Sequence, residues 1–323
     1  MMCMVLNGTS QFNAEEERQM TGGTILVTGA AGGLQGQTGR HVSELLLSQG
    51  ARVRAFVRKL DERAERLRSL GADVVVGDFL DYKSVERAVE GVSTVYFAYP
   101  VQEGLLEATA IMADAARKAG VRRLIDIVML ISAPDAPTPR MRENYLSERI
   151  FEWAGIGAAH VRATVFYENV LALTSATIAR DGAVYLPWGS DETIVPLVSA
   201  QDVASVAVGA LTSPSVTPGS SYPVIGEVLA LRDIIAIFKR VLGRDVRYQE
   251  IPDKAWADAA LGLGFNEHAV EHLSKLWQSI RTQTRRFAVT DTIRDLGGAK
   301  PQTFEAFVRG HQSAFTVKAA GDA

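Results

Sequence analysis

The sequence predicts an α/β fold: a doubly wound parallel sheet followed by a smaller, mixed C-terminal lobe. Three observations support this prediction. The apolar run at 25–27 enters a glycine-rich turn, and a helical pattern follows after Arg40. Short apolar segments then alternate with amphipathic helical segments as far as about residue 180. The segment 124–132 is almost continuously apolar, which is typical of a parallel strand covered on both faces.

The predicted elements follow one another with short connections. After the first strand, we expect strands at 51–57, 72–76, 94–98 and 124–132. Between them we expect helices at 61–70, 84–90 and 105–119. Crossovers between parallel strands should be right-handed. Beyond about residue 179 the pattern is mixed, with a short strand and turn at 184–189 and helices at 200–211, 231–242, 254–263 and 268–280.

These patterns suggest a division of the chain. Residues 23–180 should form the main domain, and segments around 190–225 should also contribute to its core. Residues 181–316 should form mainly a substrate lobe over the C-terminal edge of the sheet. Residues 1–22 are interpreted as a mobile extension and 317–323 as a tail.

Composition narrows the function classes. The 323 residues carry a net charge of −3, which gives no reason to expect nucleic acid or an acidic membrane surface as a partner. We therefore expect a small-molecule substrate, while the oligomeric state stays open. The single cysteine, Cys3, excludes an internal disulfide framework and a cysteine-rich metal site. No apolar run approaches the roughly 20 residues of a membrane span, and the start MMCMVL does not resemble a signal peptide, so we expect a cytoplasmic protein.

The segment TILVTGAAGGLQGQTGRHV at 24–42 is the most informative motif. A strand, a glycine turn and a helix hold a dinucleotide pyrophosphate against free N–H groups at a helix N-terminus, so the predicted sheet is of the Rossmann type. The spacing is irregular, because a third glycine would fall on Gln35 and the loop carries roughly four extra residues compared with the usual pattern. The alternative is a purely structural turn. The expected contacts to the cofactor are Gly29, Ala31, Gly32, Gly33, Gln35, Gly36, Thr38 and Gly39.

The end of the second strand predicts which dinucleotide binds. A carboxylate there would accept hydrogen bonds from the ribose 2′-OH of NAD. This chain instead has Arg58 and Lys59, and a guanidinium pairs well with a 2′-phosphate. The sequence therefore predicts NADPH/NADP, with a solvated helix start as the alternative explanation of the two cations.

Two further strand ends supply candidate cofactor contacts. Asp78 and Phe79 follow the third strand, where an aspartate could accept from the adenine amino group or cap the next turn. Ala98, Tyr99 and Pro100 follow the fourth strand and should face the middle of the cofactor, although Pro100 could equally stop the strand.

From about Thr24 to about Phe315, the chain resembles the NmrA-like group of atypical short-chain dehydrogenases/reductases. Besides the glycine motif, the resemblance rests on FVRK at 56–59, VVVGDFLD at 74–81, HVRATVFYENV at 160–170 and VPLVSAQDVA at 195–204. The group includes NADPH-dependent quinone- and dye-reductase-like members and cofactor-sensing regulators. The resemblance implies that the segment ending in FYEN lies beside the nicotinamide, contributing Ala163, Thr164, Val165, Phe166 and Asn169. Without it, Phe166 and Tyr167 would be interpreted as core aromatics.

The chain departs from the group at the expected catalytic position. Members usually have a lysine four residues before the glutamate that matches Glu148, and here that residue is Asn144, which can hydrogen-bond but cannot supply a proton near neutral pH. Tyr145 and Arg149 only roughly match the Tyr-x-x-x-Lys pattern of the larger superfamily. Tyr145 is a candidate donor, or a half-buried helix tyrosine without a role. Ser132, at a strand end, is a candidate partner for a substrate hydroxyl.

These observations lead to one main hypothesis and two alternatives. An acid-poor site favours flat conjugated acceptors such as quinones and azo compounds, reduced by hydride from NADPH. Aromatic walls could come from Tyr185, Trp188, Trp256 and Trp277, or these could be ordinary lobe core. The alternatives are a non-catalytic NADP(H) sensor and an enzyme for hydroxylated metabolites that depends on Tyr145. The pair His268 and His272 has helical spacing, but we do not expect a metal because no third ligand is evident.

Overall fold

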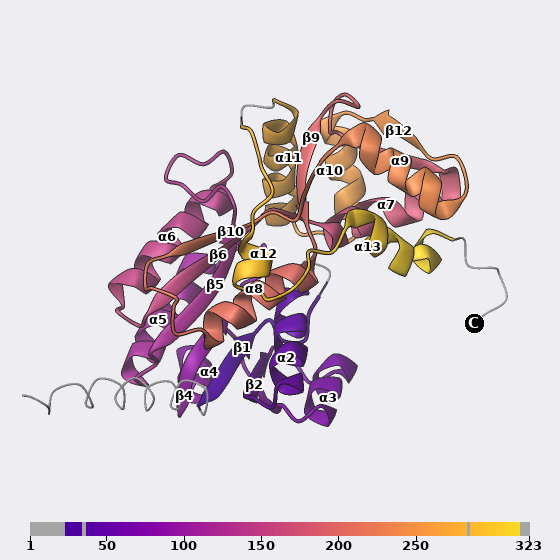
Figure 1. Ribbon diagram of the computed structural model, residues 1–323. Coiled ribbons are helices and arrows are strands. Elements are labelled where there is room, and N and C mark those ends of the chain that lie inside the picture. The colour runs from indigo at the N-terminus through magenta and orange to yellow at the C-terminus, as the bar shows by residue number, and fades with distance from the viewer. Residues whose placement is uncertain (1–22, 34–36, 283–284, 317–323) are drawn as a thin grey trace, which may run out of the picture.

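The structure is a computed structural model that describes residues 23–33, 37–282 and 285–316. Its main sheet contains seven parallel strands, which confirms the predicted Rossmann-type α/β class (Figure 1). In spatial order the strands are β10 (Ser221–Val224), β6 (Ala158–Ala163), β5 (Arg123–Met129), β4 (Val92–Phe97), β1 (Thr24–Thr28), β2 (Arg52–Val57) and β3 (Asp73–Val76). The order reverses beside β1, which is where such sheets open a crevice for a ligand.

Helices cover both faces of this sheet. One face is covered by α2 (Thr38–Ser48), α3 (Glu62–Ser69) and α8 (Ala200–Thr212), and the other by α4 (Tyr82–Val89), α5 (Leu105–Lys118) and α6 (Pro139–Trp153). Side chains of β1 alternate between the two cores, because successive residues of a strand point to opposite faces. Ile25 and Val27 join α2, whereas Leu26 joins α4 and α5.

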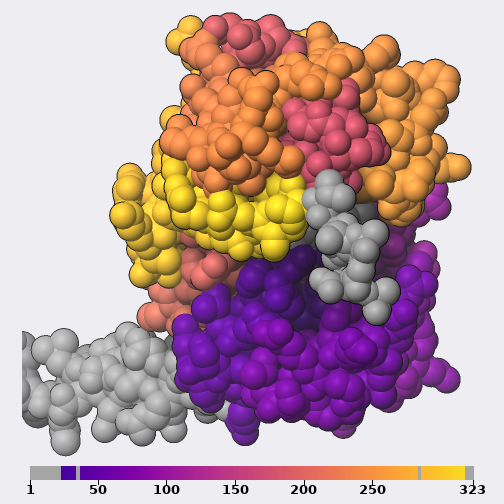
Figure 2. All heavy atoms as spheres, turned by 90° about the vertical axis from the view of Figure 1, so that its right-hand side faces the viewer, coloured from indigo at the N-terminus to yellow at the C-terminus, as the bar shows by residue number. Residues whose placement is uncertain are grey.

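The second lobe has its own apolar core. It contains β7 (Val165–Phe166), β9 (Ile194–Val198) and β11 (Glu227–Ala230) in one small sheet, and β8 (Ala183–Leu186) and β12 (Arg247–Glu250) in another. Its helices are α7 (Tyr167–Asp181), α9 (Leu231–Leu242), α10 (Asp253–Gly262), α11 (Glu267–Arg281) and α13 (Phe304–Gly310), and a 3₁₀ turn, η1 (Gln312–Phe315), follows. In the space-filling view the orange and yellow residues lie above the indigo and violet ones (Figure 2).

Later segments return to the main sheet. β10 pairs with β6, α8 packs on α2, and α12 (Thr292–Asp295) packs on α8 and β10. The division of the chain into 23–180 and 181–316 stays a proposal, but β7 and α7, from 165 to 181, pack in the core of the second lobe, and residues 200–224 add to the core of the main domain. The proposed extension 1–22 and tail 317–323 lie outside the described residues. None of the described helices is long and apolar enough to cross a membrane.

One predicted strand is shorter than expected. β5 ends at Met129, and 130–132 form a turn closed by hydrogen bonds from the backbone N–H and the hydroxyl of Ser132 to the carbonyl of Met129. Apolar character continues to Ile131 because Leu130 and Ile131 line a cavity beyond the strand end. Continuous apolarity therefore gave the wrong end for this strand.

Gly39, in the first turn of α2, fixes how closely this helix approaches β1. A Cβ atom at Gly39 would lie 2.5 Å from the Gly29 carbonyl oxygen and 2.6 Å from that of Thr28. Only glycine allows backbone contact at this distance. The contact directs the N-terminus of α2 to the carboxyl end of β1.

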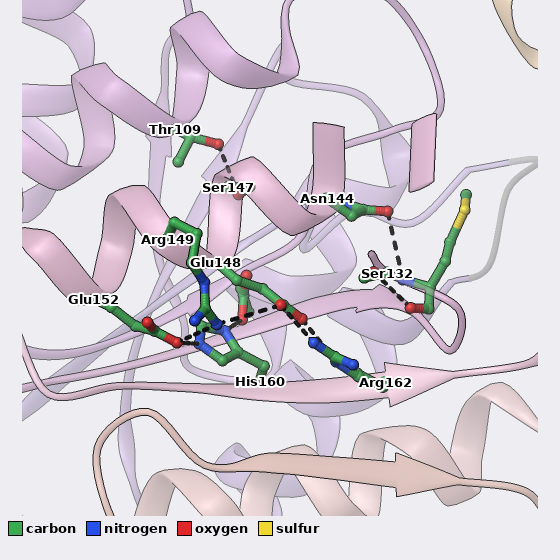
Figure 3. A network of polar contacts seen from close by, with 11 residues as sticks. Thr109, Ser132, Asn144, Ser147, Glu148, Arg149, Glu152, His160 and Arg162 are labelled. Carbon is green, nitrogen blue, oxygen red and sulfur yellow. Dashed lines mark hydrogen bonds and ion pairs between the residues drawn. The ribbon is translucent and has the colours of Figure 1, made fainter. Parts of the chain in front are cut away.

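A network of charged side chains fixes α6 on β5 and β6 (Figure 3). The two ring nitrogens of His160 contact two carboxylates, Asp126 at 2.5 Å and Glu152 at 3.1 Å. Both nitrogens must donate to make these contacts, so the ring is protonated. Burial opposes this charge, but the carboxylates of Asp126, Glu148 and Glu152 outweigh it and raise the pKa of His160.

Glu148 and two arginines complete this network. The Glu148 carboxylate is fully buried and accepts two hydrogen bonds from Arg162, at 2.8 and 2.6 Å. Burial raises the pKa of Glu148 although Arg162 opposes the shift. Arg149 pairs with Glu152 at 2.5 Å and approaches Glu148 at 3.6 Å. Three cations thus balance three carboxylates beneath the helix that carries Asn144, as buried charges require.

We expect Gly39→Ala to destabilise the protein by about 2 kcal/mol, because the added methyl group would overlap two backbone oxygens that cannot rotate away. Gly33→Ala is the matched control, since a Cβ atom there meets nothing within 4 Å. Thermal melts of both variants measure the difference. Equal melting temperatures would contradict the role given to the Gly39 contact.

We expect His160→Gln to destabilise the protein by about 3 kcal/mol, because it leaves the buried carboxylates without their cation. The raised pKa of His160 sets the sign of the pH dependence: the protonated ring stabilises fully below its unfolded pKa of about 6.5, and this contribution is lost as pH rises through the folded value. The raised pKa of Glu148 acts in the same direction.

The difference in melting temperature between wild type and His160→Gln should therefore shrink as the pH is raised from about 6 to about 9. His311→Gln, at the end of α13, is the control. A difference that grows with pH would mean that His160 is neutral in the folded protein.

Candidate cofactor and substrate site

A cavity of about 780 Å³ lies between the carboxyl edge of the main sheet and the second lobe. Every described residue that the sequence proposed for cofactor contact lines it. These residues are Gly29, Ala31, Gly32, Gly33, Thr38, Gly39, Arg58, Lys59, Asp78, Phe79, Ala98, Tyr99, Pro100, Asn144, Thr164, Val165, Phe166 and Asn169. The remaining two, Gln35 and Gly36, lie outside the described residues.

The glycine loop and the start of α2 form one end of the cavity. Gly29 and Gly32 adopt left-handed backbone angles, and the N–H of Gly32 donates to the Gly29 carbonyl at 3.0 Å. Gln37 precedes α2 with φ of 50°, and no side chain caps the helix there. The first N–H groups of α2 therefore have no capping side chain, and Gln37, Thr38 and Gly39 all line the cavity. Such a helix start suits the pyrophosphate of a dinucleotide.

Cations surround the neighbouring part of the cavity. Arg58 and Lys59 are exposed and line the cavity, and neither forms a hydrogen bond or ion pair with another described residue. The nearest carboxylate in the sequence, Asp61, does not neutralise these two cations. It caps α3 and pairs with Arg63 at 2.6 Å, which lowers the pKa of Asp61. Arg63 also donates to the Gly32 carbonyl at 2.8 Å. The side chains of Arg58 and Lys59 therefore leave unpaired positive charge beside the glycine loop, which suits an anionic group such as a phosphate.

Asp78 and Phe79 combine the roles that the sequence left open. Asp78 accepts a hydrogen bond from the N–H of Leu80 at 2.9 Å, so it caps a turn while lining the cavity. Phe79 packs edge-on against Phe56 and Tyr99, with ring centroids 5.4 and 5.2 Å apart. Phe79 is thus part of an aromatic cluster that forms the cavity wall.

The middle of the cavity floor is held by a contact between two strand ends. The N–H of Ala98 donates to the Thr28 hydroxyl at 2.8 Å, and this hydroxyl donates to the Ala98 carbonyl at 3.2 Å. The pair joins the ends of β1 and β4 directly beside Gly29, whose added Cβ would lie 3.5 Å from the Ala98 carbonyl. The floor is therefore shaped by close backbone packing.

The FYEN segment forms the wall where the two lobes meet. Thr164 lies between β6 and β7 and donates to the Pro196 carbonyl at 2.9 Å. Val165 and Phe166 pair with β9, and Asn169 lies in the first turn of α7. Phe166 also packs against the core of the main domain. Phe166 is therefore both a core aromatic and part of the cavity wall. Tyr167 is fully buried in the core of the second lobe and does not line the cavity.

Of the three proposed catalytic residues, only Asn144 lines the cavity, although Ser132 lies near Asn144, because both hydrogen-bond to Met129. Asn144 is 3% exposed, lines the cavity, and accepts from the Met129 N–H at 3.4 Å. Ser132 does not line the cavity, because its hydroxyl donates to the Met129 carbonyl at 2.7 Å in the turn after β5. Its proposed contact with a substrate hydroxyl has no support in this geometry (Figure 3).

Tyr145 also lies outside the cavity lining. Successive residues of a helix point about 100° apart, so α6 directs Asn144 inward and Tyr145 away from the site. The Arg149 guanidinium lies over the Tyr145 ring, 5.4 Å from its centroid. Tyr145 and Arg149 are therefore neighbours as the spacing predicted, but Tyr145 is half-buried beside Arg149 and outside the cavity lining.

The second lobe supplies a wall that the sequence did not predict. Residues of α11 at helical spacing face the cavity: Ala269, His272, Leu273, Leu276 and Ile280. Phe265 and Phe287 add aromatic surface, and Arg140 adds a cation. The periodicity of α11 could have indicated an inward face, but not what it faces.

The aromatic residues proposed as walls lie elsewhere. Trp188, Trp256 and Trp277 are buried in the lobe core, where the rings of Trp188 and Trp277 are 5.2 Å apart. Neither they nor Tyr185 line the cavity, so the core interpretation applies to the three tryptophans, whereas Tyr185 is half-buried on β8. His268 and His272 gain no third ligand, and no cluster of three metal-ligating side chains occurs within 23–33, 37–282 and 285–316.

Comparison with known proteins agrees with this architecture. Residues 21–308 match the model of the NmrA-like family. A (4-alkanoyl-5-oxo-2,5-dihydrofuran-3-yl)methyl phosphate reductase of Streptomyces griseus is 33% identical over 90% of this chain and 99% of its own. An NAD(P)H azoreductase of Xenophilus azovorans is 28% identical over 90% and 99% of the two chains.

The fold is also found in solved structures. That of NmrA, a negative transcriptional regulator in complex with NADP, superposes with a TM-score of 0.73 at 20% identity, covering 90% of this chain and 95% of the other. This likeness concerns the fold alone. The match to the family model extends over most of the sequence, from before β1 to α13, and the chain therefore belongs to the NmrA-like family.

Proposed function

We propose that this protein is an NADPH-dependent reductase that transfers hydride to a small, flat, conjugated acceptor. The observation that supports it best is one continuous cavity joining the glycine loop, the Arg58–Lys59 cations and an apolar wall from the second lobe. The reductase activities of two relatives of nearly full length support the same reaction class. A protein with this activity is an oxidoreductase, as the two relatives are.

The cavity residues divide the work of holding NADPH. The start of α2 and the glycine loop would bind the pyrophosphate, while Arg58 and Lys59 would bind the 2′-phosphate. Ala98 and the segment from Ala163 to Phe166 would hold the nicotinamide half. When bound, the cofactor supplies the hydride. The protein supplies position and excludes water from the acceptor.

Asn144 affects the choice of acceptor. It would occupy the position of the usual lysine, and its amide cannot donate a proton near neutral pH. Since Tyr145 and Ser132 lie outside the cavity lining, acceptors that take hydride without a strong acid are favoured. Quinones, azo compounds and conjugated lactones have this property. The relatives named for azo and dihydrofuranone substrates support this choice.

The alternatives are weaker. A non-catalytic NADP(H) sensor agrees with the shared fold of the NADP-bound regulator, but at 20% identity that likeness is limited to the fold. The apolar α11 wall, which a cofactor alone does not require, favours an enzyme. An enzyme for hydroxylated metabolites would need Tyr145 in the site, and its absence from the cavity lining argues against this.

We expect the double variant Arg58→Ala, Lys59→Ala to bind NADPH at least about 100-fold more weakly, because each charged hydrogen bond to a phosphate contributes about 1.5–3 kcal/mol. Binding of NADH should change little. Titration followed by tryptophan quenching and nicotinamide fluorescence measures both. Lys83→Ala, an exposed cation of α4 away from the cavity, is the control. Equal losses for both cofactors would refute the 2′-phosphate assignment.

We expect NADPH oxidation by the purified protein to accelerate when a quinone, an azo compound or a conjugated lactone is added. Tyr145→Phe should leave this rate unchanged within about twofold, since the side chain lies outside the cavity. Absorbance of the reduced nicotinamide measures the rate. Tight NADPH binding with no acceleration by any acceptor would favour the sensor, and loss of turnover in Tyr145→Phe would favour the hydroxylated-metabolite enzyme.

A further inference from the structure

We propose that His272 and Arg140 stabilise negative charge on an acceptor oxygen, so that the substrate class is conjugated carbonyl compounds such as quinones and enones. This inference rests on the proposed function and refines it. Both residues line the second-lobe end of the cavity, and both are 3% exposed. His272 lies on α11 and Arg140 in the first turn of α6, so the pair forms only where the two lobes meet.

The position of the His272 ring is fixed by one hydrogen bond. Its Nδ1 lies 2.9 Å from the hydroxyl oxygen of Thr138, the residue that caps α6. Its Nε2 forms no hydrogen bond with another described residue, and it is not among the fully buried, unpaired nitrogens found in that part of the chain. Because His272 lines the cavity, the open side of Nε2 is the cavity itself.

The bonding of Thr138 determines which nitrogen carries the proton. Its hydroxyl oxygen already accepts from the Met141 N–H at 3.1 Å, and the residue is fully buried. The hydroxyl proton needs an acceptor, and His272 Nδ1 is the one within reach among the described residues. Thr138 therefore donates to Nδ1, which leaves the imidazole proton on Nε2. The ring presents an N–H donor to the cavity.

The ring keeps this neutral donor form across the physiological pH range. Burial, together with the charges of Arg140 and His268, lowers the pKa of His272 to about 3. A neutral imidazole N–H is a poor proton donor but a good hydrogen-bond donor. It can therefore stabilise a developing oxyanion without transferring a proton.

Arg140 adds a fixed positive charge beside this donor. Its guanidinium donates to the Tyr99 carbonyl at 2.9 Å and the Gln102 carbonyl at 3.3 Å, and it lies over the Tyr99 ring. Burial lowers the pKa of Arg140 to about 10, so it stays charged at neutral pH. It has no carboxylate within ion-pair distance among the described residues, and its Nε is buried and unpaired. The charge of Glu143 opposes the effect of burial on the pKa of Arg140, but no described carboxylate pairs directly with the guanidinium, and such a cation favours negative charge nearby.

These properties match one type of acceptor. A conjugated carbonyl compound takes the hydride from the reduced nicotinamide at carbon, and the electron pair of its π system moves to oxygen. That oxygen gains the negative charge, which the His272 N–H and the Arg140 cation stabilise more than the neutral ground state. A proton from water then neutralises the oxygen, and the nicotinamide is left oxidised. No protein acid is consumed, in agreement with an amide at Asn144.

The first test uses a probe that needs no cofactor turnover. 4-Nitrophenol bound to the full-length protein is titrated by its absorbance, which reports its own ionisation. We expect the wild-type cavity to lower the pKa of the bound phenol relative to free phenol, and His272→Leu to reverse most of this shift. His272→Gln, whose amide N–H can reach the position of Nε2, should restore it in part. An unshifted phenol in wild type, or an equal shift in His272→Leu, would overturn the inference.

The second test uses turnover of a para-quinone. Loss of a donor to a developing oxyanion should lower kcat of His272→Leu about 100-fold with KM little changed. The kcat of His272→Gln should be at least about tenfold higher than that of His272→Leu. His268→Leu is the matched control, because it removes a histidine from the same helix outside the cavity lining. A change confined to KM would mean that His272 only shapes the pocket.

The two proposals fail in different ways. If the protein reduces no acceptor but the bound phenol still shifts and depends on His272, the oxyanion site is real and the reductase proposal falls. If quinone turnover is normal in His272→Leu and the phenol is unshifted, the reductase proposal stands and this inference falls. Circular dichroism of each variant checks that α11 remains folded.

Discussion

The backbone contact between α2 and β1 at Gly39 is the constraint on which the cofactor end of the cavity depends. It directs a helix start without a capping side chain to the carboxyl edge of the sheet. Two hydrogen bonds between Thr28 and Ala98 then hold the end of β4 beside the end of β1. Together these contacts form a floor of backbone groups on which a flat, anionic cofactor can lie.

Charge is used in two opposite ways in this molecule. Beneath α6, the cations of His160, Arg149 and Arg162 are balanced by carboxylates, which gives a rigid support without net charge. At the cavity, Arg58 and Arg140 have no carboxylate partner among the described side chains. Cations that no carboxylate pairs with directly favour an anionic ligand, so their placement along one cavity indicates where negative charge belongs.

The orientation of α6 connects these observations. The charge network holds the inner face of this helix on β5 and β6, and that orientation places Asn144 in the cavity and Tyr145 outside it. The site thereby lacks the usual proton donors of its superfamily. The polar groups that remain at the acceptor end, His272 and Arg140, can stabilise charge but not donate a proton readily. An acid-poor site and an oxyanion-stabilising wall are therefore two consequences of one arrangement.

The sequence by itself determined the parallel sheet, the glycine loop and the strand-end residues of the cofactor cavity, because their signals are local: each lies within a few residues of a strand end, and all such ends meet at one edge. Only the tertiary structure decided that Tyr145 lies outside the cavity lining, that the Trp188 and Trp277 rings pair in the lobe core, and that His272 meets Thr138 across 134 positions. Helical periodicity indicates that a face is buried, but not its partner, since packing between distant segments chooses that partner.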